Sequence, residues 1–414
     1  MRDLPRVVVT GIGVVSPLGP LPQFWAQLRA GANGFAPIDW FDAGPTAPGT
    51  AARVRDWQPR DHIKPASLRR MDRFSQMVVS ACRMAVADAG IDLTPAKAEE
   101  TGVVVGAAYG NLLETEAFLR GLIAKGPALA NPMIFPNLVL NASAGYAAIE
   151  LGLRGPNFTV CRNETSGEAA VALAYDAIAC GHADVILTGG GDEVSPVLFH
   201  VNKDLGALSP GRPHAGGAAL AEWSSPFDRD RNGMILGEGV AMLVLERAEH
   251  ARARRATVYA ELVGYATHTV PSTPHLWPHP AAAAPRAMAD QLRALRGADE
   301  IDAIVSCANS TRDLDAFEAA HLAGLLGEGA ARALVTSVKG AVGEFGGAGA
   351  LGTAVAALAL RDGHVPALAT LRRPDPACTL RLAAPGAAPS AVRAALVSGS
   401  ARGGACTALL LRQP

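Results

Sequence analysis

The chain has 414 residues, of which 49% are hydrophobic and 18% are charged, and its formal net charge at pH 7 is −1. This length is enough to bury a large core, in one large domain or in two. Because the formal net charge is close to zero, the composition excludes an extended basic surface, and we expect neither nucleic acid nor a membrane as a partner. No apolar stretch reaches the roughly 18–20 residues that a membrane-spanning helix needs.

The cysteines and the first residues indicate a reducing compartment. The six cysteines contain no CxxC pair, and residues 2–3 (Arg-Asp) lead directly into an apolar run without a signal-peptide pattern. These features predict reduced thiols in a cytoplasmic protein. The ten histidines have no ligand spacing, and glycine-rich residues 343–349 lack the Gly-Lys-Ser/Thr of a phosphate loop. We therefore predict no metal site and no cofactor.

Hydrophobic spacing predicts strands that alternate with helices along the whole chain. The predicted strands are the apolar or β-branched runs at residues 7–15 (with a turn at its glycines), 102–106, 158–161, 183–192, 240–246, 258–265, 303–307, 333–337, 394–397 and 407–411. The predicted helices cover residues 22–30, 71–89, 111–124, 142–151, 168–180, 247–255, 287–295, 314–326 and 348–360. Residues 31–68, 203–221 and 271–284 are predicted loops, and residues 133–140 are irregular. This alternation favours an α/β protein whose buried mixed sheet is covered by helices.

Two segments of the chain are similar to each other. Residues 166–182 and 348–364 are both apolar, Ala-rich and helical in spacing, and both end in Gly-His. Such an internal repeat predicts a duplicated fold in which each half supplies one buried helix. We place the two halves at residues 1–255 and 256–414.

One turn between a strand and a helix has the pattern of a reactive site. Residues 158–161 are predicted to form a buried strand, small residues 164–167 follow, and the Ala-rich helix then begins. A sharp turn of this kind (the crest) aims a side chain at the helix N-terminus, which has free N–H groups and a partial positive charge. Nucleophiles and oxyanions are stabilised there. The crest residue is Glu164, which is a poor nucleophile for acyl transfer.

The sequence resembles the β-ketoacyl-acyl-carrier-protein synthases of fatty-acid and polyketide assembly. The resemblance is carried by five collinear motifs, at residues 8–19 (VVTGIGVVSPLG), 146–157 (YAAIELGLRGPN), 183–190 (ADVILTGG), 226–239 (PFDRDRNGMILGEG) and 337–343 (SVKGAVG). It implies a thiolase-like α/β fold with two duplicated halves in five layers, α-β-α-β-α, that is usually dimeric. This implication agrees with the internal repeat.

Active members of that family use a Cys nucleophile and two His, and the resemblance implies that all three have changed here. The Cys position is Glu164, the first His position is Cys307, and the second is Glu344. Lys339 and Glu318 are retained; in the family they support the site, and here they are candidates for a buried ion pair. Two carboxylates facing one pocket, Glu164 and Glu344, would raise the pKa of one of them or need Lys339 as a counter-ion.

The resemblance also identifies residues 400–406 as the loop with which active members gate the site through two Phe. Both Phe are absent from this sequence. The loop carries Arg402 instead, and we expect Arg402 to form a salt bridge with Glu164 or Glu344.

The absence of the catalytic Cys and of both catalytic His is similar to the pattern in the chain-length factors, the ketosynthase β-subunits of bacterial type II polyketide systems. It implies a non-catalytic subunit that pairs with an active ketosynthase and serves the decarboxylative condensation of malonyl-ACP, with acyl carrier protein as a further partner. Strand residues 157–160 would pair with their counterpart in a heterodimer. Residues 106–137 would reach the partner's pocket, where Met133, Ile134 and Phe135 either set the depth of the acyl tunnel or form plain interface core.

Two alternatives keep chemistry in this chain. In the first, Glu164 assists the decarboxylation of malonyl-ACP, although the enzymes that work this way retain two His that this chain lacks. In the second, Cys307 is a nucleophile for acyl hydrolysis or transacylation, with Glu344 or Glu164 as its base. Because Cys307 ends an apolar strand, a buried inert thiol is the simpler interpretation.

Overall fold

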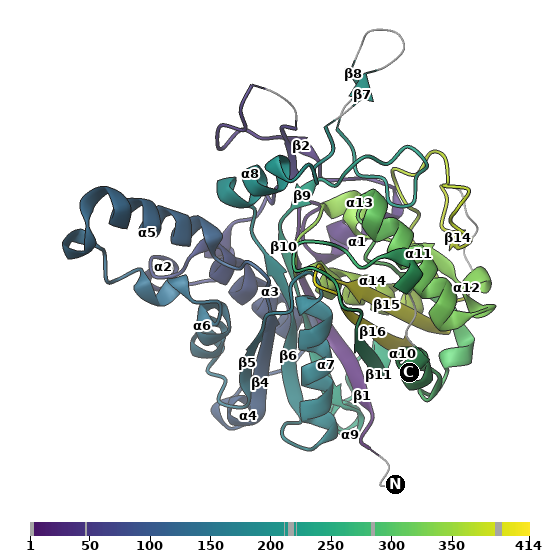
Figure 1. Cartoon of the computed structure of the whole chain (residues 1–414). Helices are drawn as coiled ribbons and strands as arrows, with labels where there is room; N and C mark the ends of the chain where they lie inside the picture. The colour runs from purple at the N-terminus through teal and green to yellow at the C-terminus, as the bar shows by residue number, and fades with distance from the viewer. Residues whose placement is uncertain are drawn as a thin grey trace.

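The computed structural model describes residues 4–45, 48–210, 212–213, 219–220, 222–282, 286–385 and 391–414. Its centre is a mixed eleven-stranded sheet with the order β14-β13-β12-β15-β16-β11-β1-β10-β6-β4-β5 (Figure 1). The strands are β1 (Val7–Val15), β4 (Thr101–Gly106), β5 (Asn157–Val160), β6 (Val185–Asp192), β10 (Gly239–Arg247), β11 (Ala260–Thr269), β12 (Ile301–Val305), β13 (Leu334–Thr336), β14 (Arg381–Leu382), β15 (Ala394–Ser400) and β16 (Ala405–Arg412).

The sheet consists of two copies of one topology. The order β1-β10-β6-β4-β5 in the first half repeats as β11-β16-β15-β12-β13 in the second. The pairing directions repeat as well: β4 is parallel to β5 and β6, as β12 is to β13 and β15. The halves join where Val7–Val9 of β1 pair with β11 in antiparallel register. The predicted duplication is therefore confirmed.

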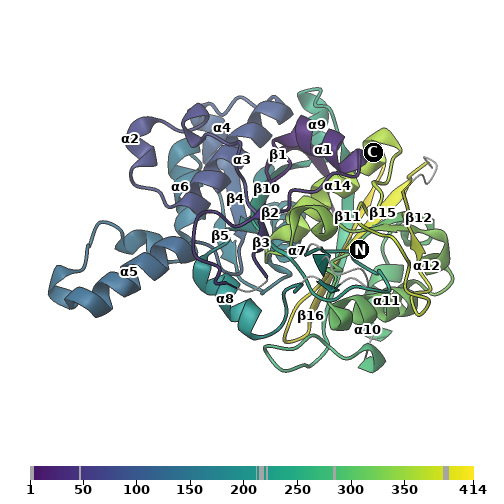
Figure 2. The ribbon, with the colours of Figure 1, turned by 90° about the horizontal axis from the view of Figure 1, so that it is seen from above.

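Helices form three layers around these two half-sheets. Between them lie α7 (Ser166–Ala179) and α14 (Ala348–Asp362), which contact each other and strands of both halves. The outer layers contain α3 (Arg73–Ala89) and α6 (Ala142–Leu151) on the first half, and α10 (Arg286–Arg293) and α11 (Arg312–Leu326) on the second (Figures 1 and 2). The five-layer α-β-α-β-α arrangement is thus confirmed, and the two similar Ala-rich segments are its central helices.

The remaining elements are shorter or lie outside these layers. The helices are α1 (Leu21–Arg29), α2 (Pro65–Leu68), α4 (Pro95–Glu100), α5 (Leu112–Lys125), α8 (Pro196–Asp204), α9 (Ala248–Ala253), α12 (Gly329–Arg332) and α13 (Lys339–Val342). The strands are β2 (Ala36–Pro37), β3 (Thr50–Ala52), β7 (Arg212–Pro213), β8 (Ala219–Leu220) and β9 (Leu236–Gly237). Among the described residues, no helix is both long enough and apolar enough to cross a membrane.

The turn predicted at the glycines of the first strand is wrong. β1 runs without interruption through Gly11 and Gly13, with a shift of register between Val9 and Gly11. A β-carbon on either glycine would collide with the backbone of α3. The glycines therefore serve the close packing of helix on strand, which a sequence pattern does not distinguish from a turn.

Two other expectations about the elements need correction. The strand predicted to be buried at residues 158–161 is β5, whose Phe158 is 48% exposed because β5 is the edge strand and, among the described strands, pairs only with β4. The predicted loops at residues 31–68 and 203–221 contain short elements, and α8 extends to Asp204. Residues 46–47, 211, 214–218, 221 and 283–284 of the predicted loops lie outside the described residues. The division of the chain after residue 255 falls between α9 and β11 and stays a prediction.

Candidate functional site

The crest between β5 and α7 is a tightly hydrogen-bonded turn. The backbone N–H of Arg162 donates to Ser166 Oγ at 2.8 Å, and the N–H of Thr165 donates to the Arg162 carbonyl at 3.2 Å. Asn163 has a φ of +48°, a left-handed conformation that Asn tolerates better than most residues. The turn therefore places Glu164, which is 2% exposed, just before the N-terminus of α7.

Arg402 neutralises the crest carboxylate. Its Nε lies 2.9 Å from Glu164 Oε1, and its backbone N–H donates to Glu164 Oε2 at 3.1 Å. The guanidinium also donates to Asn202 Oδ1 at 3.3 Å and lies over the Trp277 ring, 5.4 Å from its centroid. The salt bridge expected from the sequence is confirmed, with Glu164 as its partner. Since Glu164 precedes α7 and Arg402 follows β15, the bridge links the two halves of the fold.

We expect Arg402→Ala to lower the free energy of unfolding by about 2 kcal/mol, because the substitution removes the cationic partner of the Glu164 carboxylate and leaves it the backbone N–H of residue 402. Denaturation by urea, compared with the unsubstituted chain in the same buffer, measures the change. A difference below about 0.5 kcal/mol would mean that the bridge contributes nothing to stability, as for many exposed pairs.

A second carboxylate is held by a buried lysine. Lys339 Nζ lies 2.8 Å from Glu344 Oε1 and donates to Oε2 at 2.9 Å, and Asn309 Nδ2 donates to the same Oε2 at 2.7 Å. Burial raises the pKa of Glu344, Lys339 opposes this rise, and the negative charge of Glu164 adds to it. Burial disfavours the charge on Lys339, yet Glu344 holds the pKa of Lys339 above its ordinary value. Lys339 is therefore the counter-ion of Glu344.

Glu318 and Cys307, the two remaining predicted residues, lie in the same buried region, and no ion pair of the described residues includes either of them. Glu318 accepts hydrogen bonds from the hydroxyls of Ser306 at 3.1 Å and Ser400 at 3.3 Å. The proposed pairing of Glu318 with Lys339 is wrong, because Lys339 binds Glu344 instead. Burial, reinforced by the charge of Glu318, raises the pKa of Cys307 well above its ordinary value. Cys307 is therefore a protonated thiol, which is a poor nucleophile.

Sequence reasoning missed the importance of Glu168, in the first turn of α7. This side chain is buried, and its Oε2 has no hydrogen-bond partner among the residues that the structure describes. The carboxyl lies against Gly349 and Gly399, where a β-carbon on either glycine would collide with it. Burial raises the pKa of Glu168 to about 7. The two glycines were the available signal, but they lie more than 180 residues away from Glu168 in the sequence.

Asp192, at the end of β6, was also missed. It accepts backbone N–H groups from Tyr109 at 2.7 Å, Gly110 at 2.6 Å and Gly347 at 2.9 Å, and a longer one from Ala108. Burial raises its pKa to about 6, although these hydrogen bonds favour the charged form. Asp192 thereby fixes the backbone that leads towards α5 and the backbone that precedes α14.

The three predicted tunnel residues lie on the surface of this chain. Met133 is 76% exposed and Phe135 61% exposed, in the segment between α5 and α6, and Ile134 is half-buried beside them. The Phe135 ring contacts Phe118 of α5 edge to face, at 6.2 Å between centroids. They do not form part of the buried region around Glu164.

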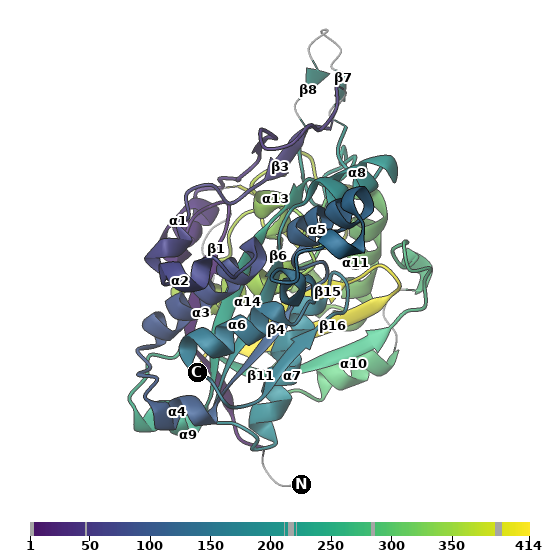
Figure 3. The ribbon, with the colours of Figure 1, turned by 90° about the vertical axis from the view of Figure 1, so that its left-hand side faces the viewer.

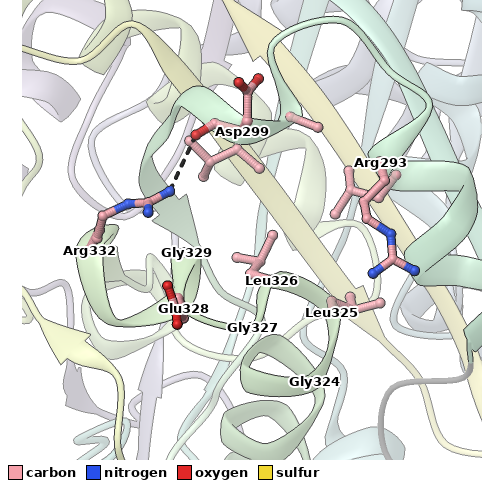
Figure 4. A pocket seen from close by; sticks show the side chains of 12 residues that line it. Arg293, Asp299, Gly324, Leu325, Leu326, Gly327, Glu328, Gly329 and Arg332 are labelled. Atoms are coloured by element: carbon pink, nitrogen blue, oxygen red, sulfur yellow. Dashed lines mark hydrogen bonds between the residues drawn. The ribbon is translucent and has the colours of Figure 1, made fainter.

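Two cavities differ in their position relative to the crest. One of about 340 Å³ adjoins the site and is lined by residues 205–207, 232–234, 275–277 and 311–313 and by Arg402 (the Arg402 cavity). Another of about 520 Å³ lies between α10, α11 and α12, where Arg332 donates to the Asp299 carbonyl (Figure 4). None of the predicted site residues lines the second cavity.

Two repeated α/β halves that meet at a buried strand-to-helix crest define the thiolase-like ketosynthase fold. The family "Beta-ketoacyl synthase, N-terminal domain" matches residues 5–251, and "Beta-ketoacyl synthase, C-terminal domain" matches residues 259–372. The chain is 34% identical to 3-oxoacyl-[acyl-carrier-protein] synthase 2 of Coxiella burnetii, over 91% of this chain and 90% of that protein. The chain belongs to the β-ketoacyl synthase family.

Two solved structures are similar over the full length of both chains. The ishigamide ketosynthase/chain length factor has a TM-score of 0.89 and 30% identity to this chain. A type II PKS acyl-carrier protein in complex with its ketosynthase bound to the hexaketide gives a TM-score of 0.88 and 25% identity. These similarities agree with the resemblance seen in the sequence.

Proposed function

We propose that the chain is a non-catalytic, chain-length-factor-like subunit. It would pair with an active ketosynthase that performs the decarboxylative condensation of malonyl-ACP, and it would shape the acyl tunnel of the pair. The observation that carries this proposal is the neutralised crest. Glu164, at the position of the family's nucleophile, is bound by Arg402 through both its side chain and its backbone N–H.

The rest of the site supports an inactive subunit. Condensation by this family needs a thiolate for acyl transfer and donors that stabilise the developing carbanion. Cys307 is buried and protonated, while Glu344 is paired with Lys339 and cannot donate when ionised. None of the ten histidines lies within five residues of Cys307 or Glu344. The same geometry disfavours Glu164 as a decarboxylation catalyst and Cys307 as a nucleophile.

An exposed apolar surface supports the heterodimer. It covers α5, the segment before α6, α6 itself and the open edge of β5. The helices α5 and α6 face the viewer in Figure 3. Its exposed side chains are Leu119, Ile123, Leu129, Met133, Phe135, Val139, Ile149 and Phe158. An open strand edge can be completed by another strand, and exposed apolar side chains on neighbouring elements are typical of an interaction site. A partner of the same fold could pair its own edge strand with residues 157–160.

The partners and the compartment follow from this proposal. Met133, Ile134 and Phe135, on that surface, would enter the partner's pocket and limit the length of the chain that grows there. Acyl carrier protein would bind the pair, as it does the ketosynthase in one of the similar structures. All six cysteines are free thiols, which supports a reducing compartment and hence our proposal of the cytoplasm.

Condensation with malonyl-loaded carrier protein tests the proposed function. The assay compares three samples: this chain alone, the active ketosynthase encoded beside it alone, and the two proteins co-expressed. Activity only in a co-purifying pair supports the proposal. Turnover or CO₂ release by this chain alone would favour chemistry at Glu164 or Cys307 instead. Phe158→Asp should abolish co-purification, whereas Leu4→Asp, which alters a 61% exposed side chain before β1, should not.

We expect Glu164→Cys to produce no condensation activity in the chain alone. The new thiol would lack both histidine donors, so the carbanion and the oxyanion would remain unstabilised. Release of β-ketoacyl product from malonyl- and acyl-loaded carrier protein is the measurement. Product above the level of the unsubstituted chain would contradict the proposal that the site is inactive.

A further inference from the structure

The Arg402 cavity ends at the residue that binds the crest. Arg402 lines the cavity, but Glu164, 2.9 Å from its Nε, does not, and neither does Glu344. The side chain of Arg402 is 13% exposed, whereas that of Glu164 is 2% exposed. Arg402 therefore stands between solvent in the cavity and the crest carboxylate.

Arg402 is held in this position from three sides. Glu164 binds it from the crest, Asn202 of α8 accepts its hydrogen bond at 3.3 Å, and Trp277 covers the guanidinium face. Trp277 belongs to the cavity wall. Contacts from three separate segments restrict an Arg side chain far more than a single exposed ion pair does.

Met234 and Thr311 hold a similar position towards Glu344, and both line the cavity. Met234 Sδ lies 3.6 Å from Nδ2 of Asn309, which donates to Glu344, and Thr311 Oγ1 donates to Asn309 Oδ1 at 2.7 Å. Glu164 is thus separated from the cavity by Arg402, and Glu344 is separated from it by Asn309 together with Met234 and Thr311.

We propose that the side chains of Arg402 and Met234 separate the crest from the Arg402 cavity, so that solvent in the cavity does not reach Glu164 (the seal). We further propose that truncation of Arg402 is enough to open access from the cavity to the crest. The seal rests on contacts within this chain, so it holds whether or not the chain pairs with a ketosynthase. It makes the crest inaccessible to any reagent or acyl group that enters the cavity, in addition to the loss of the catalytic side chains.

Alkylation of a thiol at the crest tests the seal. In Glu164→Cys, Arg402 keeps its contacts with Asn202 and Trp277, so iodoacetamide should modify the introduced thiol slowly. In Glu164→Cys/Arg402→Ala the rate, followed by mass spectrometry of the crest peptide, should rise at least tenfold. A rate that is unchanged or lower would overturn the proposal. A lower rate is the result expected if Arg402 acted only as a nearby charge that favours the thiolate.

The control is Glu164→Cys/Arg312→Ala, which removes a different arginine of the same cavity. Its rate should stay within twofold of the single variant, and an equal rise would overturn the assignment to Arg402. Modification of Cys82, which is fully buried in α3, should stay slow in every variant with an intact fold. If Glu164→Cys does not fold, amide exchange of residues 162–168 in Arg402→Ala replaces it: exchange at least tenfold faster supports the seal, and an unchanged rate overturns it.

Discussion

Lys339→Met will lower the free energy of unfolding by about 3–5 kcal/mol at pH 8, the cost typical of removing one partner from a buried ion pair. Methionine fills the space of the lysine stem but leaves Glu344 without a counter-ion. Both side chains of the pair are only 3% exposed, so water cannot replace the ammonium group. The loss should shrink at lower pH, because burial already raises the pKa of Glu344 and its protonation removes the uncompensated charge.

Urea denaturation at pH 5.5 and pH 8 measures this effect. The matched control is Lys339→Met/Glu344→Gln, in which a neutral amide takes the place of the carboxylate and remains within reach of Asn309. The double variant should recover most of the lost stability and should lack the additional dependence on pH that the unpaired Glu344 gives the single variant. Equal loss in the single and double variants would show that packing around the lysine stem, rather than its charge, stabilises this region.

Glu168→Gln is expected to stabilise the fold increasingly as the pH rises. Burial raises the pKa of Glu168 to about 7, so between its ordinary value of 4.5 and pH 7 the folded chain holds a proton that the unfolded chain has released. Over that window the wild-type chain loses about 3 kcal/mol as the pH rises, and above it the difference is constant. The amide fits the same space against Gly349 and Gly399 and has no charge to bury.

The difference in unfolding free energy between Glu168→Gln and the unsubstituted chain should therefore increase by about 3 kcal/mol from pH 4.5 to pH 8. Asp192 and Asp315 also have raised pKa values, but they titrate in both chains and cancel in the difference. Glu99→Gln is the control, since that side chain is 64% exposed. A difference that does not change with pH would mean that Glu168 is solvated or paired in the folded chain.

Local patterns were sufficient to predict most of the central elements. The bounds of α6 agree with the prediction residue for residue, and β4 and α14 differ from it by at most two residues at either end. In these segments the spacing of apolar residues and the ending glycines carry the information. α8 was missed although Ser195 caps it by accepting the N–H of Leu198, with Pro196 in its first turn. That capping signal spans only a few residues, and it lies in residues 193–202, for which no helix or strand was predicted.

The burial of a strand and the choice of ion-pair partners could not be predicted in this way. β5 has the apolar composition of a core strand, but its exposure depends on its place in the strand order. Lys339 could have paired with Glu318 or with Glu344, and only the fold decides between them. A salt bridge of Arg402 with Glu164 or Glu344 was predicted because motif alignment brought these loops together, and the structure selects Glu164.

The open edge of β5 also has a consequence for how the chain must be produced. Unpaired N–H and C=O groups beside exposed apolar side chains make a surface on which any stray strand can add. Copies of this chain whose β5 edge stays uncovered would therefore be prone to aggregate, and more so at higher concentration. Under the proposed pairing, co-expression with the ketosynthase partner covers that edge, so it should raise the soluble yield above that of this chain expressed by itself.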